Sequence, residues 1–439
     1  MTSPDENDLG GPAADAVRAA SYERLAVVAA LLYRQVGGLP PVGLEMGELV
    51  AASGMPDLAA GAVEDLVVCG LLRRRELVGG SVLYRMDCAA REHAAGLAEV
   101  LDPAGERVAV GRRWVEYLLA GALAARAVLT PSAPPERVLL RHPLPGPRVV
   151  FDGAVGALAW LASHQDSVAA AVPFARELGW NDVAWRLLVA AWPVAQRRRN
   201  HAFWLPLLVD HGLPAAGCAG DDQAERYLLS LIGEGWLHED QPAEALACFE
   251  DMLAGARQQL DERDVAVALL GLGQVQLQVG RQRPAMSSLR RAADIFGSLG
   301  ERHGLGRSLI LLGGLAATFG EPEEDVQLLS RAVDLLGECR EVYDMARARA
   351  HLGLARARRG AHVAASTALL QARAEFAASG ALWWEARSVE WLAAASRRQL
   401  GNDGTRHLRN EAVLLYALAG SPDAARLRAM DARRDALTP

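Results

Sequence analysis

The sequence contains no lysine, and all 46 of its basic residues are arginine. This absence excludes a Schiff-base lysine and the phosphate-binding lysine of a P-loop. The five cysteines are scattered and form no C-x-x-C pair, which indicates reduced thiols rather than a disulfide framework. No apolar run reaches the ~18 residues of a membrane span, and the acidic first residues lack the apolar core of a signal peptide. We therefore expect a cytoplasmic protein.

Motifs for catalysis and metal binding are also missing. The ten histidines form no H-E-x-x-H and no His/Cys cluster at zinc spacing, and there is no G-x-S-x-G. Gly271-x-Gly273 lies within an expected helix rather than after a strand, so it does not fit a dinucleotide-binding loop. We expect no catalytic residues, no metal site and no cofactor, and hence a protein that is not an enzyme.

A 40-residue period organises the second half of the chain. Residues 225–424 divide without gaps into five blocks, and their ninth positions are Gly233, Gly273, Gly313, Gly353 and Ala393. A second glycine returns at the sixteenth or seventeenth position, as Gly280, Gly320, Gly360 and Gly401. Apolar residues recur at helical spacing on both sides of it, which predicts two helices in each block. Such a period indicates a solenoid, because one helical pair cannot bury its apolar stripe alone.

The columns of these blocks resemble the tetratricopeptide repeat in its 40-residue form. Ala245, Phe249 and Met252 match the small and large apolar positions of its second helix, whereas Asp325 and Arg409 depart from the pattern in later blocks. The resemblance implies a mainly α fold, a right-handed superhelical stack of helical hairpins. It also implies that the first helix of each hairpin lines a concave groove for a protein or peptide partner.

The N-terminal region has a different pattern. Helical periodicity is expected over 21–36, 44–52 and 57–70, followed by two apolar-rich runs that flank Gly79-Gly80. Three helices and a hairpin predict a small winged-helix domain. The third helix carries Asp57, Glu64 and Asp65 and no arginine, which disfavours DNA as its ligand.

DNA binding nevertheless remains an alternative function. The residues suited to contact DNA would be three on the first strand of the hairpin: Arg73, Arg74 and Arg75. A transcription regulator of this kind would hold phosphates with them. We favour a structural or protein-contacting winged helix over one that binds DNA.

The order of parts is similar to the C-terminal half of actinobacterial STAND regulators of the NB-ARC type. The similarity rests on residues 84–87 (YRMD) with the helix after them, and on residues 157–161 (ALAWL) before Val168. In such proteins the winged helix belongs to a switch and the repeats bind a partner. No G-x-x-x-x-G-K-[ST] is present, so we carry over no nucleotide-binding domain and expect no nucleotide binding.

We divide the chain on these patterns into six parts. They are a disordered N-terminus (1–20), a winged-helix-like domain (21–102), a helical connector with a Pro-rich linker (103–152), an irregular helical start of the solenoid (153–224), five repeats (225–424) and a C-terminal tail (425–439). The irregular start is rich in tryptophan, including Trp160, Trp185, Trp192 and Trp204. These rings fit core packing, and the alternative is an apolar pocket of an enzyme of specialised metabolism.

Arginine accumulates at two positions of the later first helices. The third position of the blocks gives Arg307, Arg347 and Arg387, and the fourteenth gives Arg358 and Arg398. Stacking of the repeats would align them into rows, and guanidinium forks suit carboxylates and phosphates. We expect a non-enzymatic regulatory or scaffold protein whose groove binds an acidic protein or peptide. The alternative is a solvated face whose arginines pair with local Glu and Asp.

Overall fold

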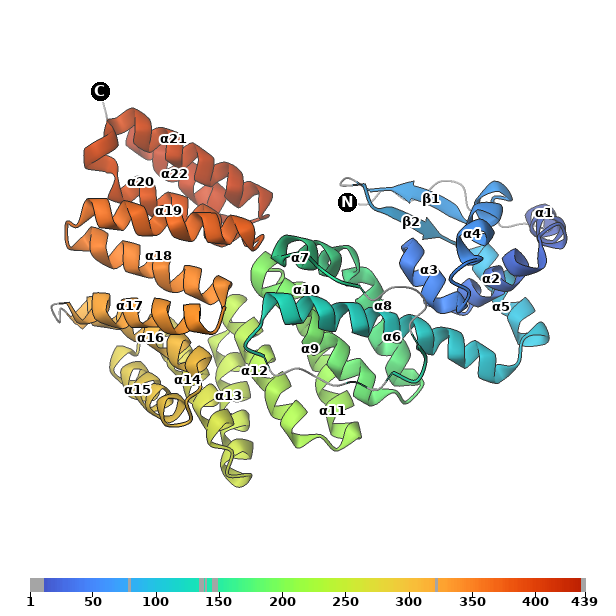
Figure 1. Ribbon diagram of the computed structural model, residues 1–439, viewed down its shortest axis with the longest axis horizontal. Helices are drawn as coiled ribbons and strands as arrows, with labels where there is room; N and C mark the ends of the chain where they lie inside the picture. The colour runs from blue at the N-terminus through green and yellow to red at the C-terminus, as the bar shows by residue number, and fades with distance from the viewer. Residues whose placement is uncertain are drawn as a thin grey trace. The chain divides into compact units, whose positions relative to one another are not determined.

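The computed structural model describes residues 12–77, 80–133, 138, 140–143, 149–319 and 323–435. These residues are mainly helical and form two compact units (Figure 1). The first unit takes its described residues from 1–124, 136–150 and 160–191, and the second from 125–135, 151–159 and 192–439.

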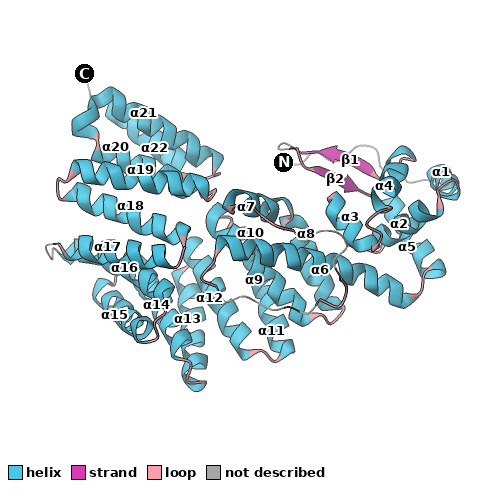
Figure 2. Ribbon diagram, in the orientation of Figure 1, coloured by secondary structure: helices cyan, strands magenta, loops and turns pink. Residues whose placement is uncertain are grey.

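The N-terminal region contains helices and one small sheet. Its helices are α1 (Pro12–Glu23), α2 (Val27–Gly37), α3 (Met46–Ser53), α4 (Ala59–Val68), α5 (Cys88–Leu101), α6 (Ala104–Leu129), α7 (Ala154–Ser163), α8 (Gln165–Glu177) and α9 (Asn181–Arg198). Strands β1 (Arg73–Glu76) and β2 (Val82–Arg85) pair antiparallel, with Arg74 opposite Tyr84, and are the magenta arrows of Figure 2. The three helices and the hairpin thus occur in the expected order. Their assignment to a winged helix stays a prediction.

The N-terminal boundaries differ from those expected. Residues 12–20 belong to α1, whereas we expected disorder over 1–20, and Ser21, the first residue of the helix expected over 21–36, lies inside α1. The reason is a tertiary contact that the local pattern does not reveal. Tyr22 packs 5.7 Å from the ring of Tyr33 and accepts a hydrogen bond of 2.6 Å from Arg34. Arg34 also forms two 2.8 Å bonds to the carboxylate of Asp102.

The second unit confirms the predicted helical solenoid. Its helices are α10 (His201–Leu207), the π-helix η1 (Leu208–Gly212), α11 (Leu213–Ala219), α12 (Asp222–His238), α13 (Pro242–Gln258), α14 (Glu262–Gln278), α15 (Gln282–Ser298), α16 (Arg302–Phe319), α17 (Glu324–Glu338), α18 (Val342–Arg358), α19 (His362–Ala378), α20 (Leu382–Ala395), α21 (Arg397–Leu418) and α22 (Asp423–Asp435). Each 40-residue block supplies one pair, from α12–α13 to α20–α21, and each helix packs on the next. The fold is therefore a stack of tetratricopeptide-like hairpins.

Left-handed residues mark both turns of the repeat. The turn within a block has positive φ at Asp240, Gly280 and Gly360, and Gly320, which we expected there too, lies outside the described residues. The turn between blocks has positive φ at Leu260, Gly300, Arg340, Gly380 and Gly420. A left-handed residue directly after a helix lets the last carbonyls find N–H partners while the chain reverses. The period in sequence is thus also a period in backbone conformation.

The glycines of the ninth column are required by close packing within each hairpin. A Cβ atom at Gly313 would lie 2.6 Å from Leu329 Cγ, and one at Gly353 would lie 2.7 Å from Leu369 Cγ. Gly233 faces Phe249 and Gly273 faces Leu289 at similarly short distances. The large apolar side chain of the second helix therefore packs directly against the backbone of the first helix at this glycine.

Two departures from the repeat pattern have local explanations. Asp325 is buried, and its carboxylate is paired with Arg359 at 2.6 Å. Arg409 pairs with Asp431 of α22 at 2.9 Å. Residues 425–435 thus belong to α22 rather than to a tail, and Leu427 of this helix packs into the core cluster of α20 and α21. The last hairpin is covered by a further helix.

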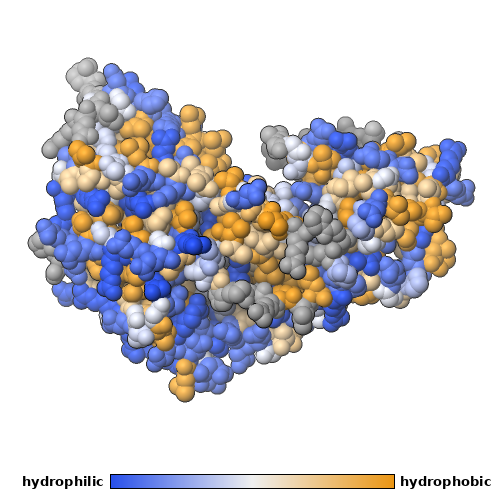
Figure 3. All heavy atoms as spheres, in the orientation of Figure 1, coloured by the Kyte–Doolittle hydropathy of each residue, from blue (hydrophilic) through white to orange (hydrophobic). Residues whose placement is uncertain are grey.

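The surface of the solenoid is mixed in polarity. In Figure 3 the surface formed by α13 and α15 is mostly hydrophilic, with single apolar residues between polar ones. Among the described residues, no helix is long and apolar enough to cross a membrane.

Candidate partner-binding site

Three arginines occupy equivalent positions on successive first helices. Arg307 lies on α16, Arg347 on α18 and Arg387 on α20, and we call these three residues the arginine row. Successive first helices pack directly on one another, so the row lies on one face of the stack. All three side chains are half-buried, with exposed fractions of 25%, 19% and 30% in that order.

Each arginine of the row has one acidic neighbour. Nη2 of Arg307 lies 3.9 Å from Oε1 of Glu234. Nη1 of Arg347 donates to Oδ1 of Asp344 at 2.7 Å, and Nη1 of Arg387 approaches Glu390 Oε2 at 3.2 Å. These pairs agree with the alternative that local carboxylates neutralise the row. They engage only part of each guanidinium, which has five N–H donors.

Aromatic rings hold two members of the row in place. The guanidinium of Arg347 lies 5.4 Å from the ring centroid of Trp384. That of Arg387 lies 5.3 Å from Trp391 and 5.8 Å from Trp383. Cation–π contact with an indole face is favourable at such distances and fixes the plane of the fork. A planar group held in this way presents its remaining donors in a defined direction.

Asp344 connects the row to a histidine. Its carboxylate accepts from Nε2 of His303 at 2.7 Å and from Arg347. Burial alone would raise the pKa of Asp344, but the His303 bond and the Arg347 charge outweigh it and hold the pKa well below its usual range. Burial likewise opposes the charged form of His303, yet the bond to Asp344 raises the pKa of this imidazole above its ordinary value.

A segment of the chain itself lies against the same helices. The backbone N–H of Ser132 donates to Oε1 of Glu341 at 2.8 Å, and its hydroxyl bonds to that carboxylate as well. The hydroxyl oxygen also lies 3.0 Å from Nδ1 of His303. Part of the region expected to be a Pro-rich linker is therefore bound to the starts of α16 and α18.

Two further arginines, which the sequence analysis did not single out, lie beside the row. Arg197 and Arg199 come from the end of α9, and only the run of three arginines at 197–199 signalled them. The guanidinium of Arg197 lies 4.7 Å from the ring of Tyr343, and that of Arg199 lies 4.0 Å from Trp383. The end of α9 thus reaches helices that are 145 residues and more away in sequence, and no periodicity encodes this contact.

The fourteenth position does not extend the row. Arg358 is exposed near the end of α18, and the side chain of Arg398 lies outside the described residues. Nε2 of Gln278, at the same position in an earlier block, donates to Asp240 at 2.7 Å. The structure thus brings together the third-position arginines, and it supplies no described contact that joins the fourteenth-position ones to them.

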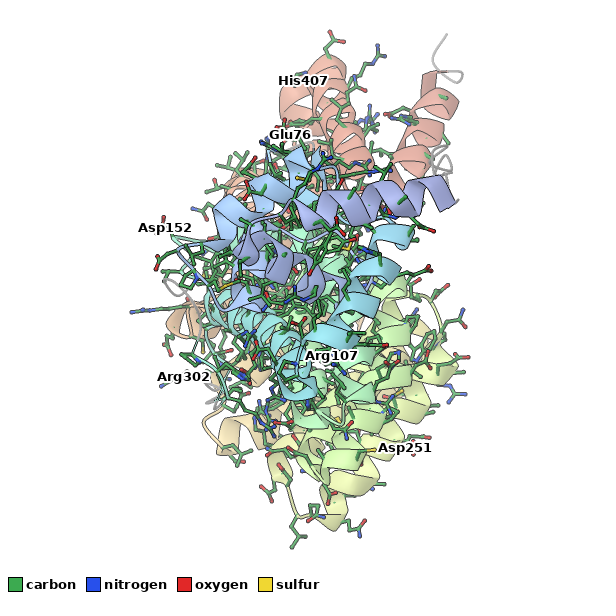
Figure 4. The ribbon with its side chains drawn as sticks, turned by 90° about the vertical axis from the view of Figure 1, so that its right-hand side faces the viewer. Glu76, Arg107, Asp152, Asp251, Arg302 and His407 are labelled. Carbon is green, nitrogen blue, oxygen red and sulfur yellow. The ribbon has the colours of Figure 1, made fainter. Side chains whose placement is uncertain are left out.

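The three arginines of the hairpin are exposed on β1. Nη2 of Arg73 lies 3.6 Å from Asp87, and Nη2 of Arg74 lies 3.2 Å from Glu76, which Figure 4 labels. Arg75 is equally exposed. The exposed polar side chains of α4 include Glu64 and Asp65, so this helix presents negative charge. The residues proposed to contact DNA thus lie in an environment that is partly acidic.

The tryptophans of the solenoid start pack in separate groups. Trp160 stacks on His164 at 4.1 Å, and Trp192 meets His201 edge-on at 5.6 Å. Trp185 is 6% exposed and Trp204 is fully buried. Trp185, Trp192 and Trp204 thus belong to the core, whereas Trp160 is half-buried. Over the described ranges, no three His, Cys, Asp or Glu residues lie where they could hold a metal ion.

Comparison with known proteins gives structural likeness only. No family model and no curated protein matches the sequence. A Rap protein complexed with competence and sporulation factor aligns with 61% of this chain and 77% of its own, at 13% identity and a TM-score of 0.46. A STAND protein with a tetratricopeptide repeat sensor from Pyrococcus horikoshii aligns with 97% of this chain and 61% of its own, at 13% identity and a TM-score of 0.43. A putative kinesin light chain with tetratricopeptide-like repeats from Podospora anserina aligns with 44% of this chain and 94% of its own, at 18% identity and a TM-score of 0.36. The structures similar to this chain thus include tetratricopeptide-repeat proteins, one of them a STAND protein.

Proposed function

We propose that this chain is a non-enzymatic regulatory or scaffolding protein of the cytoplasm. Its repeats would bind an acidic segment of a protein or peptide partner on the face that carries the arginine row. The observation that supports this most is the recurrence of arginine at one position of α16, α18 and α20, where it is half-buried beside carboxylates and aromatic rings.

The geometry favours an extended acidic ligand over a compact one. One residue of the row comes from each hairpin, so the cationic groups are spaced by the stacking distance of first helices, about 8–10 Å. An extended peptide spans ~3.3–3.6 Å per residue, so acidic side chains about three residues apart could meet successive arginines. Charged hydrogen bonds contribute ~1.5–3 kcal/mol each, and three of them would give useful affinity.

The N-terminal unit has a separate role in this proposal. We infer that its helices and hairpin form a winged-helix-like domain that contacts protein rather than DNA. The exposed Glu64 and Asp65 of α4 support this inference, because a helix that enters the major groove must approach phosphates. No described cluster of acid, base and nucleophile favours an enzyme.

Capture of the partner from the native host, followed by its identification, tests the proposal. The best test variant is Arg307→Gln with Arg387→Gln, because Arg347 also neutralises the buried Asp344 and its replacement would disturb the fold. Losing two charge-assisted contacts should weaken capture by roughly a hundredfold or more. The melting temperature should change by no more than a few degrees.

A matched control exists on the second helices of the hairpins. Arg290 and Arg331 are exposed on α15 and α17, so Arg290→Gln with Arg331→Gln removes the same charge from helices that do not carry the row. This control should capture the partner as the parent does. Equal capture by both double variants would show that the partner binds elsewhere, and the proposal would be rejected.

A further inference from the structure

Arg197 and Arg199 are the charges of this region that lack an acidic partner. Among the described residues, no ion pair within 4.0 Å joins either guanidinium to a carboxylate. Arg197 is only 4% exposed; its Nη2 donates to the carbonyl of Leu129, and its Nε has no hydrogen-bond partner. A buried cation is normally paired, because desolvation of a lone charge is costly.

The surrounding carboxylates are already engaged. Asp344 accepts from His303 and Arg347, and Glu390 accepts from Tyr416 at 2.8 Å and pairs with Arg426. Asp423 accepts from Nε1 of Trp383 at 2.9 Å. These carboxylates therefore have donors of their own, and they act on Arg197 and Arg199 only through charge beyond ion-pair distance.

Positive charge from the arginines also acts on two nearby imidazoles. Burial and the charge of Arg199 lower the pKa of His201 to about 3. Burial and the charges of Arg347, Arg358 and Arg387 lower the pKa of His351 to about 3. Burial opposes a charge of either sign, whereas these arginine charges would favour a bound anion.

The ring of Trp383 lies against two of these arginines. Arg199 lies 4.0 Å from its ring centroid and Arg387 lies 5.8 Å from it, so one indole orients two guanidinium groups. The bond from Trp383 to Asp423 fixes the ring, and Arg347 also contributes to the potential at Arg199. A guanidinium group that contacts a ring can still use its remaining N–H donors for oxygen atoms, and carboxylates and phosphates match its fork bidentately.

We infer that Arg199 and Arg387, which share the ring of Trp383, form an oxyanion site together with Arg347, which lies on the neighbouring Trp384. This site binds a carboxylate or phosphate group of the partner. This inference rests on the proposed function, because it names the chemical group that the partner would present there. Arg199 is half-buried, and therefore part of this residue is in contact with solvent. Arg197 acts behind the site as a positioning residue through Tyr343 and Leu129.

Titration of the full chain with short peptides tests the inference. The probes are acetylated, amidated hexaglutamate, the same peptide with one phosphoserine, and hexaglutamine, followed by tryptophan fluorescence and calorimetry at low salt. We expect hexaglutamate to bind and hexaglutamine not to bind. Tenfold tighter binding of the phosphoserine peptide would identify phosphate as the natural group, and equal binding would identify carboxylate.

The backbone supplies a matched pair of variants. Arg199 has φ of +55°, a left-handed conformation that asparagine adopts readily, so Arg199→Asn keeps the turn and removes the charge. Arg340 has φ of +59° and is exposed in the turn before α18, so Arg340→Asn is the control. Arg199→Asn should weaken hexaglutamate binding at least tenfold, and Arg340→Asn should leave it unchanged.

Three results would overturn the inference. The first is that hexaglutamine binds with the same affinity as hexaglutamate. The second is that neither anionic peptide binds at millimolar concentration. The third is that the affinity of Arg199→Asn for hexaglutamate lies within twofold of the parent's affinity. Arg387→Gln gives a second test should Arg199→Asn fail to fold, and the same tenfold loss is expected. If partner capture depends on Arg307 and Arg387 while Arg199→Asn binds anions normally, the proposed function stands and the oxyanion site at Arg199 does not.

Discussion

Two adjacent glycines of α16 allow a sharp test of how the hairpins pack. Gly313 and Gly314 are both in the interior of the helix, so each Gly→Ala change should gain ~1 kcal/mol of helix propensity. A Cβ at Gly314 meets nothing within 4 Å. A Cβ at Gly313 would lie 2.6 Å from Cγ of Leu329 and 3.3 Å from the carbonyl oxygen of Asp325, well inside the 3.5–4.0 Å of a normal carbon contact.

The two variants should therefore differ in sign. Gly314→Ala should stabilise the solenoid by ~1 kcal/mol, or about 2–4 °C for a cooperative unit of ~200 residues. Overpacking costs ~1–3 kcal/mol, so Gly313→Ala should be neutral to destabilising by ~2 kcal/mol after the propensity gain. The difference between two chemically identical substitutions at neighbouring positions is then ~1–3 kcal/mol.

Thermal melting followed by circular dichroism measures both variants, and hydrogen exchange of α16 and α17 localises the effect. Leu329→Ala provides the decisive background, because it removes the atoms that a Cβ at Gly313 would meet. In that background Gly313→Ala should become stabilising, with a coupling of at least ~1 kcal/mol. Melting of Gly313→Ala at or above the temperature of Gly314→Ala in the parent background would refute the packing argument.

The remaining predictions concern charge. Arg359→Ala should destabilise the fold by ~3–5 kcal/mol, because it leaves the buried Asp325 unpaired, whereas Asp325→Leu with Arg359→Ala should recover most of this loss in chemical denaturation. The raised pKa of His303 stabilises the fold below pH ~6.5, and this contribution is lost as pH rises through the raised value. The depressed pKa of Asp344 stabilises above pH ~4 and is lost as pH falls through its lowered value. The parent should therefore lose more stability than His303→Gln between pH 6.5 and 9, and parallel melting curves would contradict this assignment. Calorimetry with ATP and Mg²⁺ should show no binding, because the chain has no lysine for a phosphate loop, and micromolar affinity would overturn that expectation.

Local patterns were sufficient for the helices of the repeats but not for α1 and α22. The periodicity placed the helices of the five blocks, because each must bury one stripe against its neighbours. It did not place α1, since that helix depends on the contact of Tyr22 with Tyr33 and Arg34 across a turn. It also missed α22, which covers the last hairpin through Leu427 and the pair between Arg409 and Asp431.

Some residues of the candidate site were likewise predictable from the sequence, and others were not. The sequence by itself determined the arginine row, because a 40-residue period brings Arg307, Arg347 and Arg387 to one face whatever the remaining contacts are. Only the tertiary structure decided that Arg199 joins them at Trp383, and that Ser132 binds beside His303. Repeats encode the relation of each helix to the next, whereas contacts between the end of α9 and α18 or α20 arise from the accumulated turn of the whole stack. A small rotation per repeat, summed over several hairpins, cannot be read from any single column of the sequence.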